Sequence, residues 1–237
     1  CGQNPAPESL VKHAEEIGAK LLMVQQDFDF ASMESVQWNY RFHPQSSDGQ
    51  SRNRNSLPFP ALRGAYQLSN AACALTVLEC LNNQLPVDIG AIKRGLLLVE
   101  NPGRFQVLPG RPLVVLDVGH NPHAARALRR SLINLAFAQK RTAVFSMLSD
   151  KDIDGVLEIV KDQFDEWNIA PLDVSRGMTV EALQAKLTEH GIDNVNVFET
   201  VAAAYRAALA KATENDRIVV FGSFHTVADV MAVLKEH

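Results

Sequence analysis

The sequence predicts an α/β fold built on a mostly parallel sheet with helices on both faces. From Arg104 onward, short runs of apolar and β-branched residues alternate with longer stretches whose apolar residues recur at i, i+3, i+4 and i+7. The short runs have the length of buried strands, and the longer stretches have the period of amphipathic helices. With 237 residues, 46% hydrophobic and 21% charged, the chain is long enough and apolar enough to bury a sizeable core.

The first part of the chain, to about Pro102, is predicted to be mixed. Residues 35–42 alternate between large apolar and polar side chains, as in a half-buried strand, and residues 64–81 are apolar around most of a helix. The predicted elements of this part are helices over 8–17, 64–81 and 88–99, strands over 19–24 and 35–42, and a polar loop or hairpin tip over 44–55. Residues 100–103, with the sequence Glu-Asn-Pro-Gly, then break the pattern and predict a hinge.

The second part of the chain carries the regular alternation. Strands are predicted near 105–108, 113–117, 142–145, 167–170, 195–198 and 217–221, with helices between them. This pattern is Rossmann-like, but the chain has no G-x-x-x-x-G-K-[ST] motif and no two glycines spaced G-x-G. We therefore exclude a dinucleotide-binding fingerprint. Two domains are predicted, over residues 1–102 and 103–237.

Charge and composition limit the classes of molecule that the chain is expected to bind. A net charge of −4 gives no overall basic field for nucleic acid or an anionic membrane, and no apolar run reaches the length of a membrane span. Arg126, Arg129 and Arg130 lie on one face of a predicted helix, where a solvated face is favoured over a binding patch. The three cysteines form no metal or disulfide pattern, which is typical of a reduced, cytoplasmic setting.

Residues 113–125 form the most informative segment. A buried strand ends in Asp117, a short loop carries His120, and a helix begins at about Pro122. Ligands of open α/β sheets bind at the carboxyl ends of strands, against helix N-termini that favour anions, so we expect a phosphorylated ligand here. Asp117 has the alternative of capping the helix. A metal triad of Asp117, His120 and His123 is disfavoured, because Pro122 would aim the histidines in different directions.

Three further polar residues are candidates, each with a structural alternative. Asn70 either caps its helix or points its amide at a ligand. Arg104, after a Pro-Gly turn, either binds phosphate oxygens or forms a salt bridge at the hinge. Ser223, after the last strand, either binds an anion or caps the last helix, and taken alone capping is favoured. The Ser223 turn and the Asp117 loop are predicted to lie on the same edge of the sheet.

Taken together, these segments resemble the folylpolyglutamate synthase/dihydrofolate synthase family of the Mur-ligase superfamily. The matching segments are L-S-N-A-A at 68–72, N-P-G-R-F-Q at 101–106, L-D-V-G-H-N-P-H-A-A at 116–125, S-M-L-S-D-K-D at 146–152 and G-S-F at 222–224. The resemblance implies an N-terminal P-loop ATPase domain and a C-terminal Rossmann-like domain. Residues 1–102 would then be the remainder of the ATP-binding central domain, and residues 103–237 the glutamate ligase domain.

The resemblance also implies an activity, an ATP-dependent amide ligase that adds L-glutamate to a pteroate or folate through an acyl phosphate, with ATP and Mg²⁺ bound between the domains. Asn70, Arg104 and Asp117 match positions that contact ATP, whereas His120 and Ser223 match positions on the side of the glutamate or acyl phosphate. The P-loop and the magnesium ligands belong upstream of Cys1. We therefore expect the chain to be a C-terminal portion, inactive alone, of a cytoplasmic monomer that binds neither nucleic acid nor membrane.

Two alternatives remain open. One is a stand-alone nucleotide- or phosphate-binding module without catalysis. The other is a different Mur-type ligase, which the P-G-R-F-Q form disfavours. The sequence does not separate dihydrofolate synthase from folylpolyglutamate synthase activity, because that choice rests on a pterin pocket that the resemblance places upstream.

Overall fold

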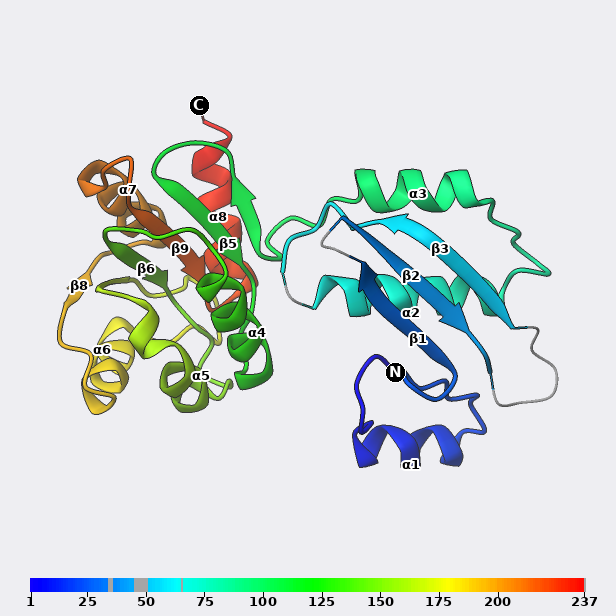
Figure 1. Ribbon diagram of the computed structural model, residues 1–237. Helices are drawn as coiled ribbons and strands as arrows, with labels where there is room; N and C mark the ends of the chain where they lie inside the picture. The colour runs from blue at the N-terminus through cyan, green and yellow to red at the C-terminus, as the bar shows by residue number, and fades with distance from the viewer. Residues whose placement is uncertain (34–35, 45–50, 65, 237) are drawn as a thin grey trace. The chain divides into compact units, whose positions relative to one another are not determined.

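The computed structural model describes residues 1–33, 36–44, 51–64 and 66–236. The chain divides into two compact units, and each is described by itself (Figure 1). Unit 1 comprises Cys1–Ala61 with Tyr66–Glu100, and unit 2 comprises Leu62–Ala65 with Asn101–His237. The domain assignments made from the sequence stay predictions.

Unit 1 is a three-stranded antiparallel sheet with helices packed on one face. Its elements are α1 (Glu8–Glu16), β1 (Phe28–Met33), β2 (Gln37–Phe42), β3 (Arg52–Pro58), α2 (Gln67–Cys80) and α3 (Ile89–Leu98), and the strand order is β1-β2-β3. Trp38 and Tyr40 of β2 are fully buried against Leu75 of α2 and Ile92 of α3. The alternation predicted over 35–42 therefore turns Trp38, Tyr40 and Phe42 inward, but Val36 lies before β2 and is 72% exposed, and residue 35 is outside the described residues.

Several predictions for unit 1 were wrong. Residues 19–24 form no strand, and only Val24 makes a bridge, to Phe28. Strand β1 was not predicted, and β3 begins within the last residues of the stretch 44–55 that was predicted as a polar loop or hairpin tip; residues 45–50 of that stretch are outside the described residues. The helix predicted over 64–81 begins later, at Gln67.

Unit 2 confirms the predicted α/β class. Its elements are β4 (Gln106–Leu108), β5 (Leu113–Asp117), α4 (Pro122–Ile133), β6 (Arg141–Phe145), α5 (Ile153–Val160), the 3₁₀ turn η1 (Lys161–Gln163), β7 (Glu166–Ile169), α6 (Val180–Glu189), β8 (Val195–Val197), α7 (Val201–Lys211), β9 (Arg217–Phe221) and α8 (Phe224–Leu234). The strand order is β4-β5-β9-β6-β7-β8, and every pairing is parallel except that of β4 with β5.

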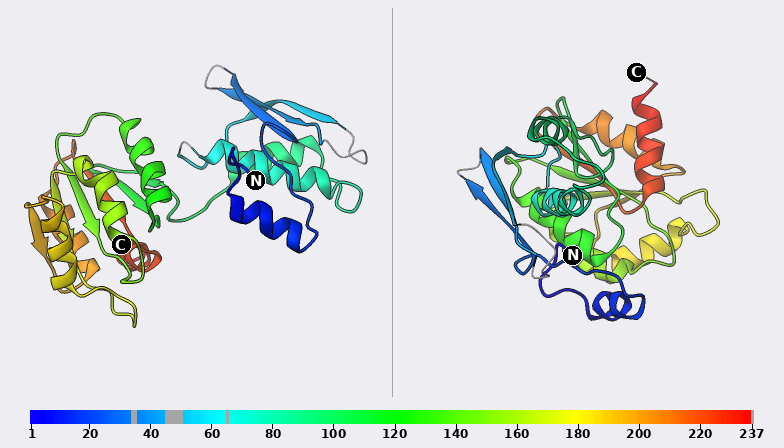
Figure 2. Two further views of the ribbon diagram at one scale, coloured as in Figure 1. Left: turned by 90° about the horizontal axis from the view of Figure 1, so that it is seen from below. Right: turned by 90° about the vertical axis from the view of Figure 1, so that its right-hand side faces the viewer.

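The helices of unit 2 cover both faces of this sheet, and Figure 2 gives two further views. Alternate residues of each central strand point to opposite faces, so each face has its own core. Val115 and Phe145 pack with α4, α5 and α6, whereas Leu116 and Val144 pack with α7 and α8. Within the described residues, no helix combines the length and the apolar character needed to cross a bilayer.

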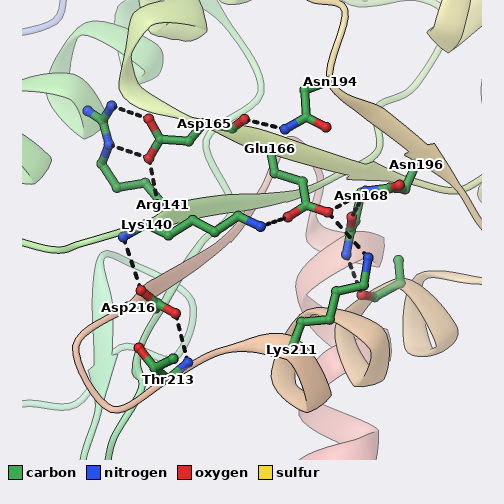
Figure 3. Close-up of polar contacts among 11 residues, drawn as sticks. Lys140, Arg141, Asp165, Glu166, Asn168, Asn194, Asn196, Lys211, Thr213 and Asp216 are labelled. Carbon is green, nitrogen blue, oxygen red and sulfur yellow. Dashed lines mark hydrogen bonds and ion pairs between the residues drawn. The ribbon is translucent and has the colours of Figure 1, made fainter.

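The amino edge of this sheet carries a dense network of charges (Figure 3). Arg141 forms a bidentate pair with Asp165, through N–O distances of 2.7 and 3.0 Å. Glu166, whose side chain is almost fully buried, is ion-paired with Lys140 and, at 3.5 Å, with Lys211. These ion pairs connect the first residues of β6 with those at the beginning of β7.

Candidate functional site

Most of the predicted site residues lie at the carboxyl edge of the sheet in unit 2. Asp117, Phe221 and Phe145 end β5, β9 and β6, and they lie in register across the three neighbouring strands. Each strand leads through a short loop into a helix, so the N-termini of α4, α8 and α5 all follow this edge. The backbone N–H groups at such termini favour anions. The Asp117 loop and the Ser223 turn therefore share an edge, as the sequence predicts.

A strained turn holds Arg104 at this edge. The Val118 N–H donates to the Gly103 carbonyl oxygen at 2.7 Å, and the Phe105 N–H donates to Asp117 Oδ2 at 3.0 Å. Phe105 has φ +45°, in the left-handed region that costs a side chain of this size about 1–3 kcal/mol. Gly103 has φ +73°, and a Cβ atom there would lie 2.8 Å from Val118 Cγ1. The turn is thus fastened to the end of β5 by a backbone bond and by the Asp117 carboxylate.

Asp117 is buried and is bound on both oxygens by backbone groups. Besides Phe105, the Gly119 N–H donates to Oδ1 at 2.7 Å. Burial raises the pKa of the Asp117 carboxyl above its ordinary value, against the opposing effects of these two hydrogen bonds and of the Arg104 charge. The capping alternative for Asp117 is wrong, because Asn121 caps α4 by accepting from the Ala124 N–H at 2.9 Å.

Phe224 links the side chains of Arg104 and His120. The Arg104 guanidinium carbon lies 5.5 Å from the centre of the Phe224 ring, within cation–π distance, and the His120 ring centre lies 5.8 Å from it. Phe224 is 53% exposed although it follows a buried strand. Among the described residues, no carboxylate lies within 4.0 Å of Arg104, so the hinge salt bridge that was the alternative for Arg104 does not form there.

The hydrogen bond of His120 sets its tautomer. Nδ1 lies 2.9 Å from the Val118 carbonyl oxygen, which only accepts, so Nδ1 carries the proton. In the neutral ring, Nε2 then keeps a lone pair that can accept a proton. Ser223 is buried, and its Oγ accepts from the His225 N–H at 3.2 Å, which confirms the capping interpretation. The Ser223 O–H remains able to donate to a ligand.

Asn70 belongs to unit 1 and does not cap its helix. It lies within α2, one turn after the cap residue Tyr66, and its exposed side chain donates from Nδ2 to Gln67 Oε1 at 3.2 Å. The structure does not form the disfavoured triad either. Within the parts of the chain that are described, no three His, Cys, Asp or Glu side chains are close enough to hold a metal ion.

Phe224 is the site residue that the sequence reasoning missed. The segment G-S-F at 222–224 was noted for its resemblance, but only Ser223 received a role. The usable signal was a large apolar residue at the first position of a helix, directly after a capping serine at the end of a strand. Such a residue lies at the ligand edge of the sheet and not in the core.

Comparisons with known proteins match the chain along its length. Residues 103–224 match the model of the Mur ligase, glutamate ligase domain. A dihydrofolate synthase/folylpolyglutamate synthase of Escherichia coli K12 is 37% identical over 235 residues, which is 98% of this chain and 51% of that protein. The chain thus spans about half the length of the curated relatives it matches.

Solved structures agree with the sequence comparisons. Escherichia coli FolC in complex with DHPP and ADP is similar with a TM-score of 0.83 and 35% identity, over 99% of this chain and 52% of that one. A bifunctional folylpolyglutamate synthase/dihydrofolate synthase with Mn, AMPPNP and L-glutamate bound is similar with a TM-score of 0.81 and 39% identity, over 99% and 52% of the two chains. Both likenesses cover unit 1 as well as unit 2.

Proposed function

The chain belongs to the Mur ligase family, and we propose that it serves an ATP-dependent ligase that joins L-glutamate to a pteroate or folate carboxylate. Similar proteins bear the names of both synthase activities, and structures of two of them were solved with nucleotide. We propose further that residues 1–102 are the remainder of the ATP-binding central domain and residues 103–237 the glutamate ligase domain. We propose that the whole reaction also needs the P-loop part that the family resemblance implies, since the chain spans about half the length of its relatives.

One observation carries this proposal: the Arg104 guanidinium lies at the carboxyl edge without a carboxylate partner among the described residues. A half-buried cation in such a place is expected to have an anionic ligand, because leaving the charge unpaired is costly. The strained turn and the Phe224 ring hold it in a fixed position. A guanidinium held in this way binds phosphate oxygens through two parallel hydrogen bonds.

The proposed reaction has two steps. The pteroate or folate carboxylate attacks the γ-phosphorus of ATP, which forms an acyl phosphate and releases ADP. The amine of L-glutamate then attacks the acyl carbon, which forms the amide, releases phosphate and gives up a proton. Arg104 neutralises negative charge on the transferred phosphoryl group, which is where such enzymes gain most of their rate.

The other edge residues have distinct proposed roles. His120 Nε2 takes the proton of the glutamate amine, since Nδ1–H is already bound to the Val118 carbonyl. Ser223 Oγ–H donates to an anionic oxygen of glutamate or of the acyl phosphate. Asp117 positions Arg104 through the Phe105 N–H, and the direct contact of Asp117 with ATP that the resemblance implies stays a prediction. Asn70 is proposed to contact ATP from unit 1.

When bound, Mg²⁺ would supply positive charge that offsets the negative charge of the phosphates. We assign no ligand for it to the described residues of this chain. The monomeric state and the cytoplasmic setting also stay predictions. The three free cysteines support the proposal of a reducing compartment.

The test is glutamate-dependent release of phosphate from ATP by the full-length protein, with Arg104→Ala compared with Arg111→Ala. Arg111 is an exposed arginine of the same unit, 3.7 Å from Glu214. A hydrogen bond to a charged group contributes about 1.5–3 kcal/mol, so Arg104→Ala is expected to lower kcat/KM for ATP by about 10- to 100-fold. Arg111→Ala should leave it within about twofold.

Two outcomes would contradict the proposal. Equal kinetics of the two variants would remove Arg104 from the phosphate site. Nucleotide binding by the full-length protein with no glutamate-dependent turnover on any pteroate or folate would favour the binding-module alternative.

A further inference from the structure

A groove of about 540 Å³ lies between α4 and α5 of unit 2, and none of the residues assigned a role above lines it. The two helices are neighbours in Figure 1. Its lining residues are His123, Arg126, Arg129 and Arg130 on one side, and Glu158, Ile159 and Asp162 on the other. The volume falls within the range of about 300–1,000 Å³ found for sites that hold small-molecule ligands.

The wall formed by α4 is cationic and unpaired. Arg126, Arg129 and Arg130 are exposed, and among the described residues no carboxylate lies within 4.0 Å of any of them. His123, Arg126 and Arg130 follow one another at i, i+3 and i+7, and so form a stripe along one face of the helix. Like charges at this spacing repel, and the groove gives them a shared place to bind an anion.

The stripe begins next to the proposed active site. His123 lies in the first turn of α4, and His120 lies in the loop that leads into the same helix. A flexible anionic chain that leaves the carboxyl edge beside His120 therefore meets His123 first and the arginines after it. This continuity distinguishes the groove from an isolated basic patch.

The wall formed by α5 and η1 is acidic. The Glu158 carboxylate is already bound by Lys161 Nζ at 2.9 Å and lies 3.4 Å from His190 Nδ1, so much of its charge is balanced locally. Its oxygens and those of Asp162 still accept hydrogen bonds. The groove thus fits a ligand with carboxylates on one side and N–H donors on the other, and it disfavours a ligand that is anionic all round.

We propose that this groove is a subsite for an oligo-γ-glutamyl tail on the folate substrate, an inference that rests on the proposed function. Each γ-linked unit carries one free α-carboxylate and one amide N–H. The carboxylates pair with the arginines of α4, and the amide N–H groups donate to Glu158 and Asp162. The tail of an acceptor that already holds several glutamates is thereby kept in place while its end is extended.

The kinetic test compares monoglutamyl and triglutamyl folate acceptors in the full-length protein. The variant Arg126→Gln/Arg130→Gln removes two charges from exposed positions, and Arg206→Gln is a control on α7, where the arginine pairs with Glu236 at 2.7 Å. Exposed pairs are individually weak, so the double variant is expected to raise KM for the triglutamyl acceptor by about three- to tenfold. KM for the monoglutamyl acceptor and kcat should change by less than about twofold.

An equal rise in KM for both acceptors, or no rise for either, would overturn the subsite. A direct measurement keeps this separate from the proposed function: titration calorimetry of the full-length protein with γ-linked triglutamate and with inorganic tripolyphosphate. Triglutamate should bind more tightly than tripolyphosphate, and the double variant should lose that binding. Tripolyphosphate binding equally well would reduce the groove to a general anion site, even if glutamate ligation is observed. If glutamate ligation is not observed but triglutamate binds as expected, the proposed function is wrong and the groove is still a binding site for γ-linked glutamates.

Discussion

Gly222 joins β9 to α8, and replacing it with alanine should strongly destabilise unit 2. Its φ of +106° is reached easily only by glycine, and a Cβ atom there would lie 2.4 Å from the Ser146 carbonyl oxygen. That oxygen cannot withdraw freely, because it accepts from Thr226 Oγ1 at 3.0 Å. The strain of a side chain in this backbone region is about 1–3 kcal/mol. Forcing β6 and β9 apart adds about 1–3 kcal/mol, as overpacking does elsewhere.

The expected loss for Gly222→Ala is therefore about 2–6 kcal/mol in the free energy of unfolding. Gly191 is a matched control, since it has φ +71° and no heavy atom within 4 Å of the added Cβ position. Gly191→Ala should cost only about 1–2 kcal/mol, for the left-handed conformation. Urea unfolding followed by Trp167, whose ring lies 5.9 Å from that of Phe221, measures both variants. If Gly222→Ala and Gly191→Ala lower the free energy of unfolding equally, the close approach to the Ser146 carbonyl oxygen does not affect stability.

Two further predictions concern buried carboxylates. Burial raises the folded-state pKa of Asp117, so its contribution to stability is present below about pH 3.9 and is lost as the pH rises through the raised value. The stability of the parent relative to Asp117→Asn should therefore fall as the pH rises through the raised value. Asp117→Asn keeps one oxygen for one of the two backbone N–H groups, but its NH₂ would face the other, so it should cost about 1–3 kcal/mol. Asp117→Ala leaves both N–H groups unpaired and should cost about 2–6 kcal/mol. Urea midpoints across the pH range measure both variants, and equal losses for the two would contradict this. For Glu166, burial opposes ionisation, but the hydrogen bond and charge of Lys140 outweigh it and hold the pKa below its usual range. The stability that ionised Glu166 contributes is present above about pH 4.3 and is lost as the pH falls through the lowered pKa. The difference in unfolding free energy between the parent and Glu166→Gln should therefore narrow in acid. Urea midpoints across the pH range measure this difference, and a difference that widens in acid would refute the prediction.

The strands of unit 2 were predictable because most are buried on both faces. Residues 113–117 and 217–221 were predicted with the bounds that β5 and β9 have, since a doubly covered parallel strand reads as a continuous apolar run. The direction of β4 was not predictable, because an apolar run carries no information on which way its neighbour runs. Residues 19–24 were predicted as a strand but do not form one. They are apolar, but only Val24 bridges another residue, and a strand needs a partner.

Strand β3 escaped prediction for an electrostatic reason. Arg52 and Arg54 alternate with asparagines, so the stretch appears uniformly polar. Both arginines nevertheless pair with Glu79 of α2, at 3.2 and 2.8 Å, and the Glu79 side chain is 2% exposed. A strand whose inward positions are charged is recognised only when the charge it faces is known, and Glu79 is distant in the sequence.

The candidate site was predictable where local geometry decides it. The strand–loop–helix pattern was enough to place Asp117, His120 and Ser223 at one edge of the sheet. It did not reveal that Asp117 fastens the turn carrying Arg104, because that contact joins Phe105 to a residue on a neighbouring strand. The same kind of tertiary contact brings Phe224 between Arg104 and His120.

The two edges of the unit 2 sheet use charge in opposite ways. At the amino edge, Arg141 is matched with Asp165 and Lys140 with Glu166, and such pairs hold strand starts together without needing a ligand. At the carboxyl edge, Arg104 has no carboxylate partner among the described residues, and burial raises the pKa of the Asp117 carboxyl. The unpaired cation and the strained turn that holds it therefore support our proposal that the ligand binds at the carboxyl edge.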